Sequence, residues 1–150
     1  MKLSELVTAK RINLDLKATT KDGVLEELVQ LLKVSNPARE ALLNTLRSRE
    51  ALGSTGVGKG IAIPHCRSLV VSEVIVAVGR SKKGISFKSM DRKRAYLFFL
   101  IVAPPVGDPA DYLIALGKVA QAARLMSADK RIKSVRGPKK FISLIEELEK

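Results

Sequence analysis

The sequence contains one histidine, His65, which follows the short apolar run 61–63 and a proline. A neutral imidazole is a competent nucleophile near pH 7. Arg49, Ser54 and Thr55 lie within the 16 residues before His65, and such polar company favours a catalytic role for the histidine. A lone histidine also fits a structural role, and Arg49 also fits an ordinary helix surface. We therefore treat His65 as a candidate catalytic residue at this point.

A glycine-rich segment, residues 53–60, lies between Arg49 and His65. It fits the pattern G-x-x-x-x-G-K of a nucleotide-binding loop, but Gly60 stands where that loop needs a Ser or Thr for Mg²⁺. The order of elements is also reversed, since this loop leads from a helix into a strand. Nucleotide binding by this loop is therefore not expected. The glycines could instead free backbone N–H groups to hold a small anion such as one phosphoryl group, unless the segment is a flexible turn with nothing bound.

Strands and helices must position these residues, and the apolar spacing predicts both. Residues 74–78 and 96–102 are continuous apolar runs of strand length, typical of central strands covered on both faces. Shorter strands are expected at residues 12–14 and 61–63. Helices separated by isolated strands indicate an α/β sandwich with a largely buried sheet. Because the polar stretches between these elements are short, we expect one domain over residues 1–150.

The helices carry recognisable start and stop signals. Thr19 or Thr20 is expected to cap the first long helix, and Asn36 before Pro37 the second, which should end at a left-handed Gly53. Two later helices should begin at Asp108-Pro109 and at Pro138. Their predicted apolar faces are Leu113, Leu116, Ala120 and Ala123 in the first, and Phe141, Leu144, Ile145 and Leu148 in the second.

Basic residues outnumber acidic residues by a wide margin. The sequence has 27 Lys and Arg against 15 Asp and Glu, which gives a net charge of +12. Much of the excess lies in residues 80–94 and 130–140, which favours anionic partners but also fits a solvated surface. Nucleic acid is not an expected partner, because aromatic residues make up only 4% and no recognition motif is present.

The remaining composition bears on membrane insertion, secretion and disulfide bonds. No apolar run approaches the ~20 residues of a membrane-spanning helix, so no direct membrane insertion is expected. The first residues lack the apolar core of a signal peptide, and the single cysteine, Cys66, excludes an intrachain disulfide. We therefore expect a cytoplasmic protein with no metal and no cofactor.

Residues 49–65, REALGSTGVGKGIAIPH, closely resemble the active-site signature of the type 2 enzyme IIA (EIIA) domains. These domains belong to the bacterial phosphoenolpyruvate-dependent phosphotransferase system, in its fructose–mannitol and nitrogen-regulatory branch. The resemblance extends over the whole chain, including residues 84–87 before Asp91 and the strand over 98–104. It implies a single-domain, three-layer α/β sandwich, with a mixed sheet of about five strands flanked by helices on both faces.

The resemblance also implies a function. His65 would accept a phosphoryl group from the phosphocarrier HPr, or its nitrogen-branch equivalent, with Arg49 stabilising the group and Ser54, Thr55 and Gly56 binding it. His65 would then pass the group to an EIIB-type domain, or keep it as a signal for a regulatory target protein. The alternative is a regulatory protein-interaction module with a degenerate active site that transfers nothing.

Three departures from the family pattern bear on this choice. Tyr112 stands where the family usually has a second histidine, and a tyrosine donates one hydrogen bond without a positive charge. Cys66 replaces a glycine; because strand neighbours point to opposite faces, we expect it to fill space and take no part in catalysis. Since the family's HPr docks with a basic face, we expect the basic residues to lie away from His65 or to serve another anion.

Overall fold

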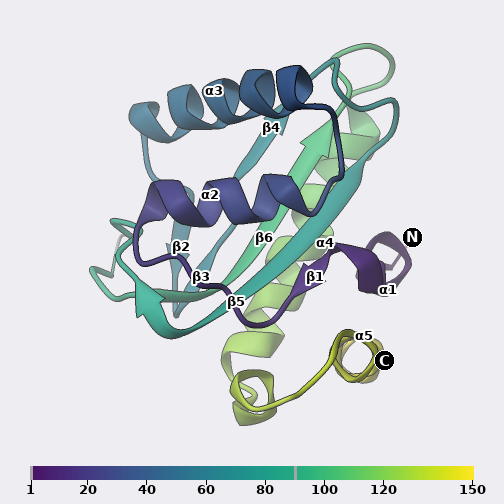
Figure 1. The fold of residues 1–150 in the computed structure, drawn as a ribbon. Helices are drawn as coiled ribbons and strands as arrows, with labels where there is room; N and C mark the ends of the chain where they lie inside the picture. The colour runs from purple at the N-terminus through teal and green to yellow at the C-terminus, as the bar shows by residue number, and fades with distance from the viewer. Residues whose placement is uncertain (1, 90) are drawn as a thin grey trace.

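A mixed β-sheet lies between two layers of helices in the computed structural model, which describes residues 2–89 and 91–150 (Figure 1). The helices are α1 (Leu3–Leu6), α2 (Lys21–Gln30), α3 (Asn36–Leu52), α4 (Ala110–Ser127) and α5 (Pro138–Leu148), with short 3₁₀ helices η1 (Ala9–Arg11) and η2 (Lys130–Lys133). The strands are β1 (Ile12–Asn13), β2 (Gly56–Gly58), β3 (Ile61–Ala62), β4 (His65–Arg67), β5 (Ile75–Ile85) and β6 (Ala95–Ala103). The predicted three-layer α/β sandwich is confirmed. The described chain has six strands where about five were expected, because pieces as short as β2 and β4 also join the sheet.

Strand β6 organises the sheet. The strand order is β1-β5-β6-β3-β2, and β4 also pairs with β6. β5 is antiparallel to β6, whereas β3 and β4 pair with it in parallel, one along its first half and the other along its second. Ile63 and Pro64 lie between β3 and β4, and the Pro64 carbonyl accepts the Ile101 N–H at 2.9 Å. Since proline has no N–H to donate, it interrupts this edge immediately before His65.

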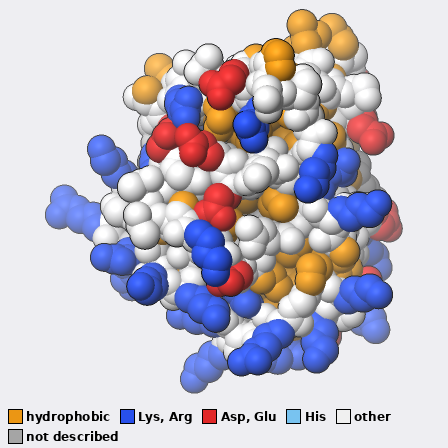
Figure 2. Space-filling view, in the orientation of Figure 1, with side chains coloured by type: hydrophobic (Ala, Val, Ile, Leu, Met, Phe, Trp, Pro, Cys, Tyr) orange, Lys and Arg blue, Asp and Glu red, His pale blue; other side chains and the backbone are white. Residues whose placement is uncertain are grey.

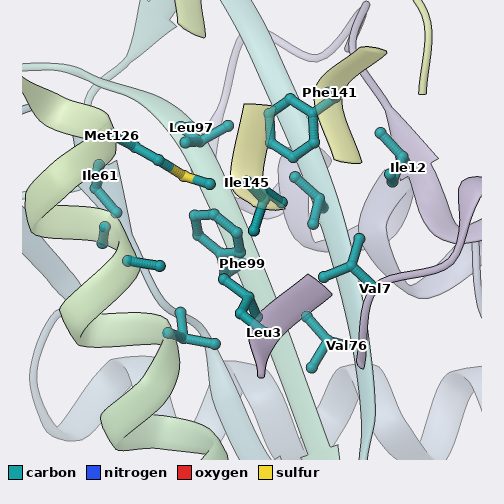
Figure 3. Packing of buried hydrophobic residues seen from close by; sticks show 14 of the residues in the cluster. Leu3, Val7, Ile12, Ile61, Val76, Leu97, Phe99, Met126, Phe141 and Ile145 are labelled. Carbon is teal, nitrogen blue, oxygen red and sulfur yellow. The ribbon is translucent and has the colours of Figure 1, made fainter. Parts of the chain in front are cut away.

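The apolar core has two halves, one on each face of the sheet. Successive side chains of β6 enter opposite halves, as the pleat requires. Leu97, Phe99 and Ile101 join the cluster beneath α1, α4 and α5 (Figure 3), and Phe98, Leu100 and Val102 join the cluster beneath α2 and α3. The prediction that the apolar run of β6 is covered on both faces is confirmed.

Strand β5 continues well beyond the run predicted over residues 74–78. Its second half, which contains Arg80, is mostly polar and has no apolar pattern that would predict a strand. The Arg80 side chain is nevertheless buried, because its Nε donates to the Leu14 carbonyl and its Nη1 to the carbonyls of Ile132 and Val135. Hydrogen bonds of this kind allow a charged residue to sit in a sheet, which hydrophobic periodicity cannot reveal.

Helix boundaries agree with the sequence at α2 and differ at α3. The Thr20 hydroxyl accepts the Gly23 N–H at 3.1 Å and caps α2, as predicted. At α3 the cap is Ser35, one residue before the predicted Asn36. The predicted left-handed conformation of Gly53 is wrong, since its φ of 162° and ψ of 145° are extended. The chain leaves α3 straight toward β2, so no reversal is needed there.

The face that α4 buries agrees only in part with the prediction, because Ala123 is buried and Leu116 packs against the core, but Leu113 and Ala120 are not buried. Its buried side chains are Ala115, Val119, Ala122, Ala123 and Met126, whereas Leu113 is 62% exposed and Ala120 is also exposed. Apolar residues run continuously over 113–116, so their spacing alone could not select the buried face. None of the helices in the described chain, α4 included, has the length and apolar character needed to cross a bilayer.

We expect the two faces of α4 to respond differently to truncation. Met126→Ala should lower the free energy of unfolding by about 2–5 kcal/mol, because it leaves a cavity in the core. Leu113→Ala should change it by no more than about 0.5 kcal/mol, because the leucine lies in solvent. Urea denaturation of both variants measures the difference. Equal losses would show that the helix packs on the face predicted from sequence.

Candidate functional site

His65 begins β4, beside the second half of β6. Its ring is half-buried, and Nδ1 lies 2.7 Å from the Ile63 carbonyl oxygen. A carbonyl oxygen can only accept, so in the neutral ring we assign the proton to Nδ1, which donates it. Nε2 then holds the lone pair, and no hydrogen bond to Nε2 occurs among the described residues. The geometry therefore leaves Nε2 available as the nucleophilic nitrogen.

Tyr112, in the first turns of α4, lies beside this ring. The centroids of the two rings are 6.3 Å apart, and their planes are tilted by 49°. Burial raises the pKa of the Tyr112 hydroxyl above its ordinary value, so this hydroxyl is a proton donor at neutral pH. The residue that replaces the family's second histidine thus lies next to His65.

Two arginines, Arg49 and Arg67, bring positive charge near the Tyr112 hydroxyl. Both Arg49 and Arg67 lower the pKa of Tyr112 against the larger effect of burial, so both charges act at this site. Arg49, in the last turn of α3, donates from Nη1 to the Gly53 carbonyl at 3.0 Å. Arg67 lies 5.8 Å from the centre of the Tyr112 ring and donates to the Pro104 carbonyl. Sequence analysis missed Arg67, although residues two apart on a strand share a face with each other.

Glu50 connects the glycine-rich loop to α3. Its carboxylate accepts both the N–H and the hydroxyl of Thr55 and forms an ion pair with Lys21 at 2.6 Å. The Thr55 carbonyl in turn accepts the Ile63 N–H at 2.9 Å. A continuous set of hydrogen bonds therefore runs from Glu50 through Thr55 and Ile63 to the His65 ring. Sequence analysis gave Glu50 no role, because the partners of a buried carboxylate are set by the fold.

The residues predicted to bind the phosphoryl group lie in this loop and already have partners. The Ser54 hydroxyl donates to the Phe87 carbonyl and accepts the Gly56 N–H at 2.9 Å. The Thr55 hydroxyl donates its hydrogen bond to the Glu50 carboxylate. A Cβ at Gly56 would collide with the Ser89 side chain, so close packing requires glycine there. The structure places the three residues beside the strand that leads to His65; their phosphoryl-binding role stays a prediction.

Cys66 points away from this site. It belongs to the core cluster beneath α2 and α3, on the opposite face from Tyr112. Burial raises the pKa of its thiol to about 12, so the thiol stays protonated and is a poor nucleophile near pH 7. This agrees with the predicted role of Cys66 as a space-filling residue. Among the described residues, no group of three or more His, Cys, Asp or Glu side chains could hold a metal ion.

Exposed apolar side chains occur on the elements that meet at His65. Leu52 ends α3, Leu69 follows β4, Val106 follows β6 and Leu113 lies in α4; their exposed fractions range from 62% to 86%. Figure 2 shows apolar side chains at the top of the molecule, where Figure 1 places the carboxyl ends of β4 and β6. Such a group of exposed leucines and valines is typical of a protein-binding surface. We call these four residues the apolar rim.

Two curated proteins are similar to this chain in sequence. Over 152 residues the chain is 32% identical to the PTS system fructose-specific EIIABC component of Bacillus subtilis, an alignment that covers 100% of this chain and 24% of that protein. Over 146 residues it is 32% identical to the nitrogen regulatory protein of Bradyrhizobium diazoefficiens, covering 97% of this chain and 95% of that one.

A solved structure shares the fold as well. The crystal structure of nitrogen regulatory protein IIA-Ntr from Neisseria meningitidis matches with a TM-score of 0.84 and 27% identity, over 95% of this chain and 98% of the other. Residues 5–148 match the family described as "Phosphoenolpyruvate-dependent sugar phosphotransferase system, EIIA 2". The chain therefore belongs to the type 2 EIIA family of the phosphoenolpyruvate-dependent sugar phosphotransferase system.

Proposed function

We propose that this chain is a histidine phosphocarrier that accepts a phosphoryl group on Nε2 of His65. The observation that carries the proposal is the hydrogen bond from Nδ1 to the Ile63 carbonyl, which leaves the Nε2 lone pair available. In the transfer, a bond forms between Nε2 and phosphorus as the bond from phosphorus to its donor breaks. Because Nε2 carries no proton, no base is needed to activate it.

The surroundings of the ring support this chemistry. As Nε2 attacks, the imidazole gains positive charge, which the Ile63 carbonyl oxygen stabilises through the Nδ1 proton. The phosphoryl oxygens carry negative charge, and we assign its balance to Arg49 and Arg67, whose charges both act on the neighbouring Tyr112 hydroxyl. The Tyr112 hydroxyl supplies one further donor. We assign Ser54, Thr55 and Gly56 the task of holding the loop beside His65. The Ser54 and Thr55 hydroxyls and the Gly56 N–H would turn to the phosphoryl group when it is bound.

The partners follow from the family and from the apolar rim. We propose that phospho-HPr, or its nitrogen-branch equivalent, docks on this rim as the donor. The acceptor is an EIIB-type domain or a regulatory target protein. The name of the Bacillus relative, EIIABC, joins an A component to a B component, whereas the Bradyrhizobium relative is named as a nitrogen regulator. Both branches therefore stay within the proposal.

A second candidate is a regulatory module that binds partners without transferring phosphate. Tyr112 favours it, because a tyrosine beside His65 cannot supply the positive charge of a protonated histidine. The two candidates differ in one property, since only the phosphocarrier acquires phosphate on His65.

Incubation with phosphoenolpyruvate, enzyme I and HPr should label the wild-type protein with an acid-labile phosphate. His65→Ala should abolish the label, because the chain has no other histidine. Cys66→Ala is the matched control and should label like wild type, since the thiol is buried on the other face. Radiolabelled phosphate followed by acid treatment provides the measurement. An unlabelled wild type would favour the second candidate, and labelled His65→Ala would refute the site.

Tyr112→Phe should slow phosphoryl transfer to His65 by roughly tenfold, the value of one lost hydrogen bond to a charged group. Tyr96→Phe is the control, because Tyr96 is the other tyrosine of the chain and lies near the start of β6. Rapid-quench kinetics with phospho-HPr measure both rates. Equal rates for wild type and Tyr112→Phe would show that the hydroxyl has no part in transfer.

Glu50→Ala should lower the free energy of unfolding by about 2–3 kcal/mol, because it leaves the Thr55 N–H and the Lys21 ammonium without their buried partner. It should also slow phosphorylation of His65, since the loop and Ile63 lose their anchor. Glu40→Ala, an exposed position on α3, should change stability by less than about 0.5 kcal/mol. Chemical denaturation and the labelling assay test both expectations. A Glu50→Ala protein that labels at the wild-type rate would contradict the role assigned to the loop.

A further inference from the structure

A cavity of about 860 Å³ lies at the other end of the sheet from His65. Its floor is made of buried core side chains, among them Ile61, Leu97 and Met126, which Figure 3 shows together between α4 and β6. Along β6, Leu97 lies four residues before Ile101, the strand partner of His65, and four residues of strand span about 13 Å. The cavity is therefore separate from the proposed phosphorylation site.

The walls of the cavity are strongly basic. Six of its lining residues carry positive charge and none carries negative charge: Lys59, Arg80, Lys82, Lys93, Arg94 and Lys133. Within residues 2–89 and 91–150, none of the six forms an ion pair with a carboxylate. Figure 2 shows Lys and Arg side chains gathered along the left and lower edges of the molecule, which include the ends of β2 and β3. Cations around a concavity concentrate positive potential inside it.

Arg80 is the buried member of this set, with 7% of its surface exposed. Its Nε and Nη1 donate only to carbonyl oxygens, and Nη2 has no hydrogen bond among the described residues. Asp15, the carboxylate that acts on it from a distance, is itself paired with Lys17 at 2.8 Å. A buried guanidinium without a counter-ion is costly, and an anion in the cavity would supply the missing negative charge.

Asp91 holds the backbone of two of the wall lysines in place. Its Oδ2 accepts the backbone N–H of Lys59 at 2.8 Å, and its Oδ1 accepts that of Lys93 at 3.0 Å. Lys59 has a φ of 56°, in the left-handed region that a lysine seldom adopts. Both bonds go to backbone groups, and within the described residues neither ammonium forms an ion pair with this carboxylate, although its charge does act on Lys93. The loop geometry thus keeps positive charge at the cavity.

An aromatic ring stands among these cations. A Cβ at Gly84 would lie 2.7 Å from the Tyr96 ring, so the ring fills the space that a side chain there would take. The Lys133 ammonium lies 5.3 Å from the centre of that ring. Ligand sites of about 300–1,000 Å³ combine apolar surface with a few polar groups that fix orientation, and this cavity has both. An aromatic ring, an apolar floor and several unpaired cations fit a ligand that joins a planar ring to more than one phosphate.

We propose that this cavity binds a nucleoside diphosphate or triphosphate, with the phosphates at the wall cations and the base over the apolar floor and Tyr96. The site is distinct from the glycine-rich loop, which contributes only Lys59 at its end. A nucleic-acid duplex fits less well, because the cations surround a hollow instead of a convex surface. The inference does not depend on phosphorylation of His65.

The test is isothermal titration calorimetry of the full chain with ATP and GTP at physiological salt. Wild type should bind at least one of them, and Lys93→Gln with Lys133→Gln should weaken that binding by roughly tenfold or more. Lys139→Gln with Lys140→Gln is the matched control: it removes the same charge from exposed residues of α5 outside the cavity, and it should bind within about twofold of wild type. Circular dichroism checks that both variants are folded. Absence of binding in wild type, or equal losses in the two variants, would overturn the proposal.

Three further titrations identify the ligand class. Adenosine and inorganic triphosphate should each bind more weakly than ATP, because each lacks one half of the ligand. Triphosphate binding as tight as that of ATP would overturn the nucleotide assignment, and so would a DNA duplex that binds more tightly than either nucleotide through Lys93 and Lys133. His65→Ala should bind ATP like wild type, so failure of the phosphocarrier proposal would leave this result unchanged. Loss of ATP binding in His65→Ala would contradict the separation of the two sites.

Discussion

The hydrogen bond from His65 Nδ1 to the Ile63 carbonyl is the interaction on which the proposed chemistry depends. It fixes the tautomer of the ring and so determines which nitrogen is nucleophilic. It is made between residues only two apart, on either side of Pro64, which lies between β3 and β4. The same Ile63 residue donates its N–H to Thr55, so the loop and the ring share one anchoring strand segment. Any change that moves Ile63 therefore moves both the nucleophile and its surroundings.

The fold separates two surfaces of different character along β6. The second half of β6 carries β4, His65 and the nearby apolar rim, whereas its first half borders the basic cavity. Six of the 27 Lys and Arg residues line this cavity, so part of the net charge of +12 lies at the first half of β6. If HPr docks at His65 as proposed, these six charges lie at the other half of the strand and repel it less than charges at the docking site would. Because β6 is buried on both faces, it provides a rigid connection between the two ends.

Sequence alone was sufficient where a pattern is local. The signature over residues 49–65 identified the family, the run over 96–102 identified the central strand, and Thr20 identified a helix start. It was insufficient where tertiary contacts decide. The second half of β5 is polar and stays in the sheet because carbonyl groups from distant segments satisfy Arg80. In α4 the consecutive apolar residues left the buried face ambiguous; three alanines with Val119 and Met126 are buried, and Leu113 is exposed.

In the candidate site, too, sequence predicted some residues and missed those whose roles depend on tertiary contacts. His65 and Tyr112 were placed together by family resemblance, and the structure brings their rings into contact range. Glu50 and Arg67 were missed, because their roles come from the loop bonds of Thr55 and from the shared face of β4.

A direct measurement of the central claim is ¹⁵N nuclear magnetic resonance of the imidazole, which is unambiguous in a chain with one histidine. The account predicts that, in the neutral ring, the proton resides on Nδ1 and Nε2 is unprotonated. A spectrum with the proton on Nε2 would contradict it.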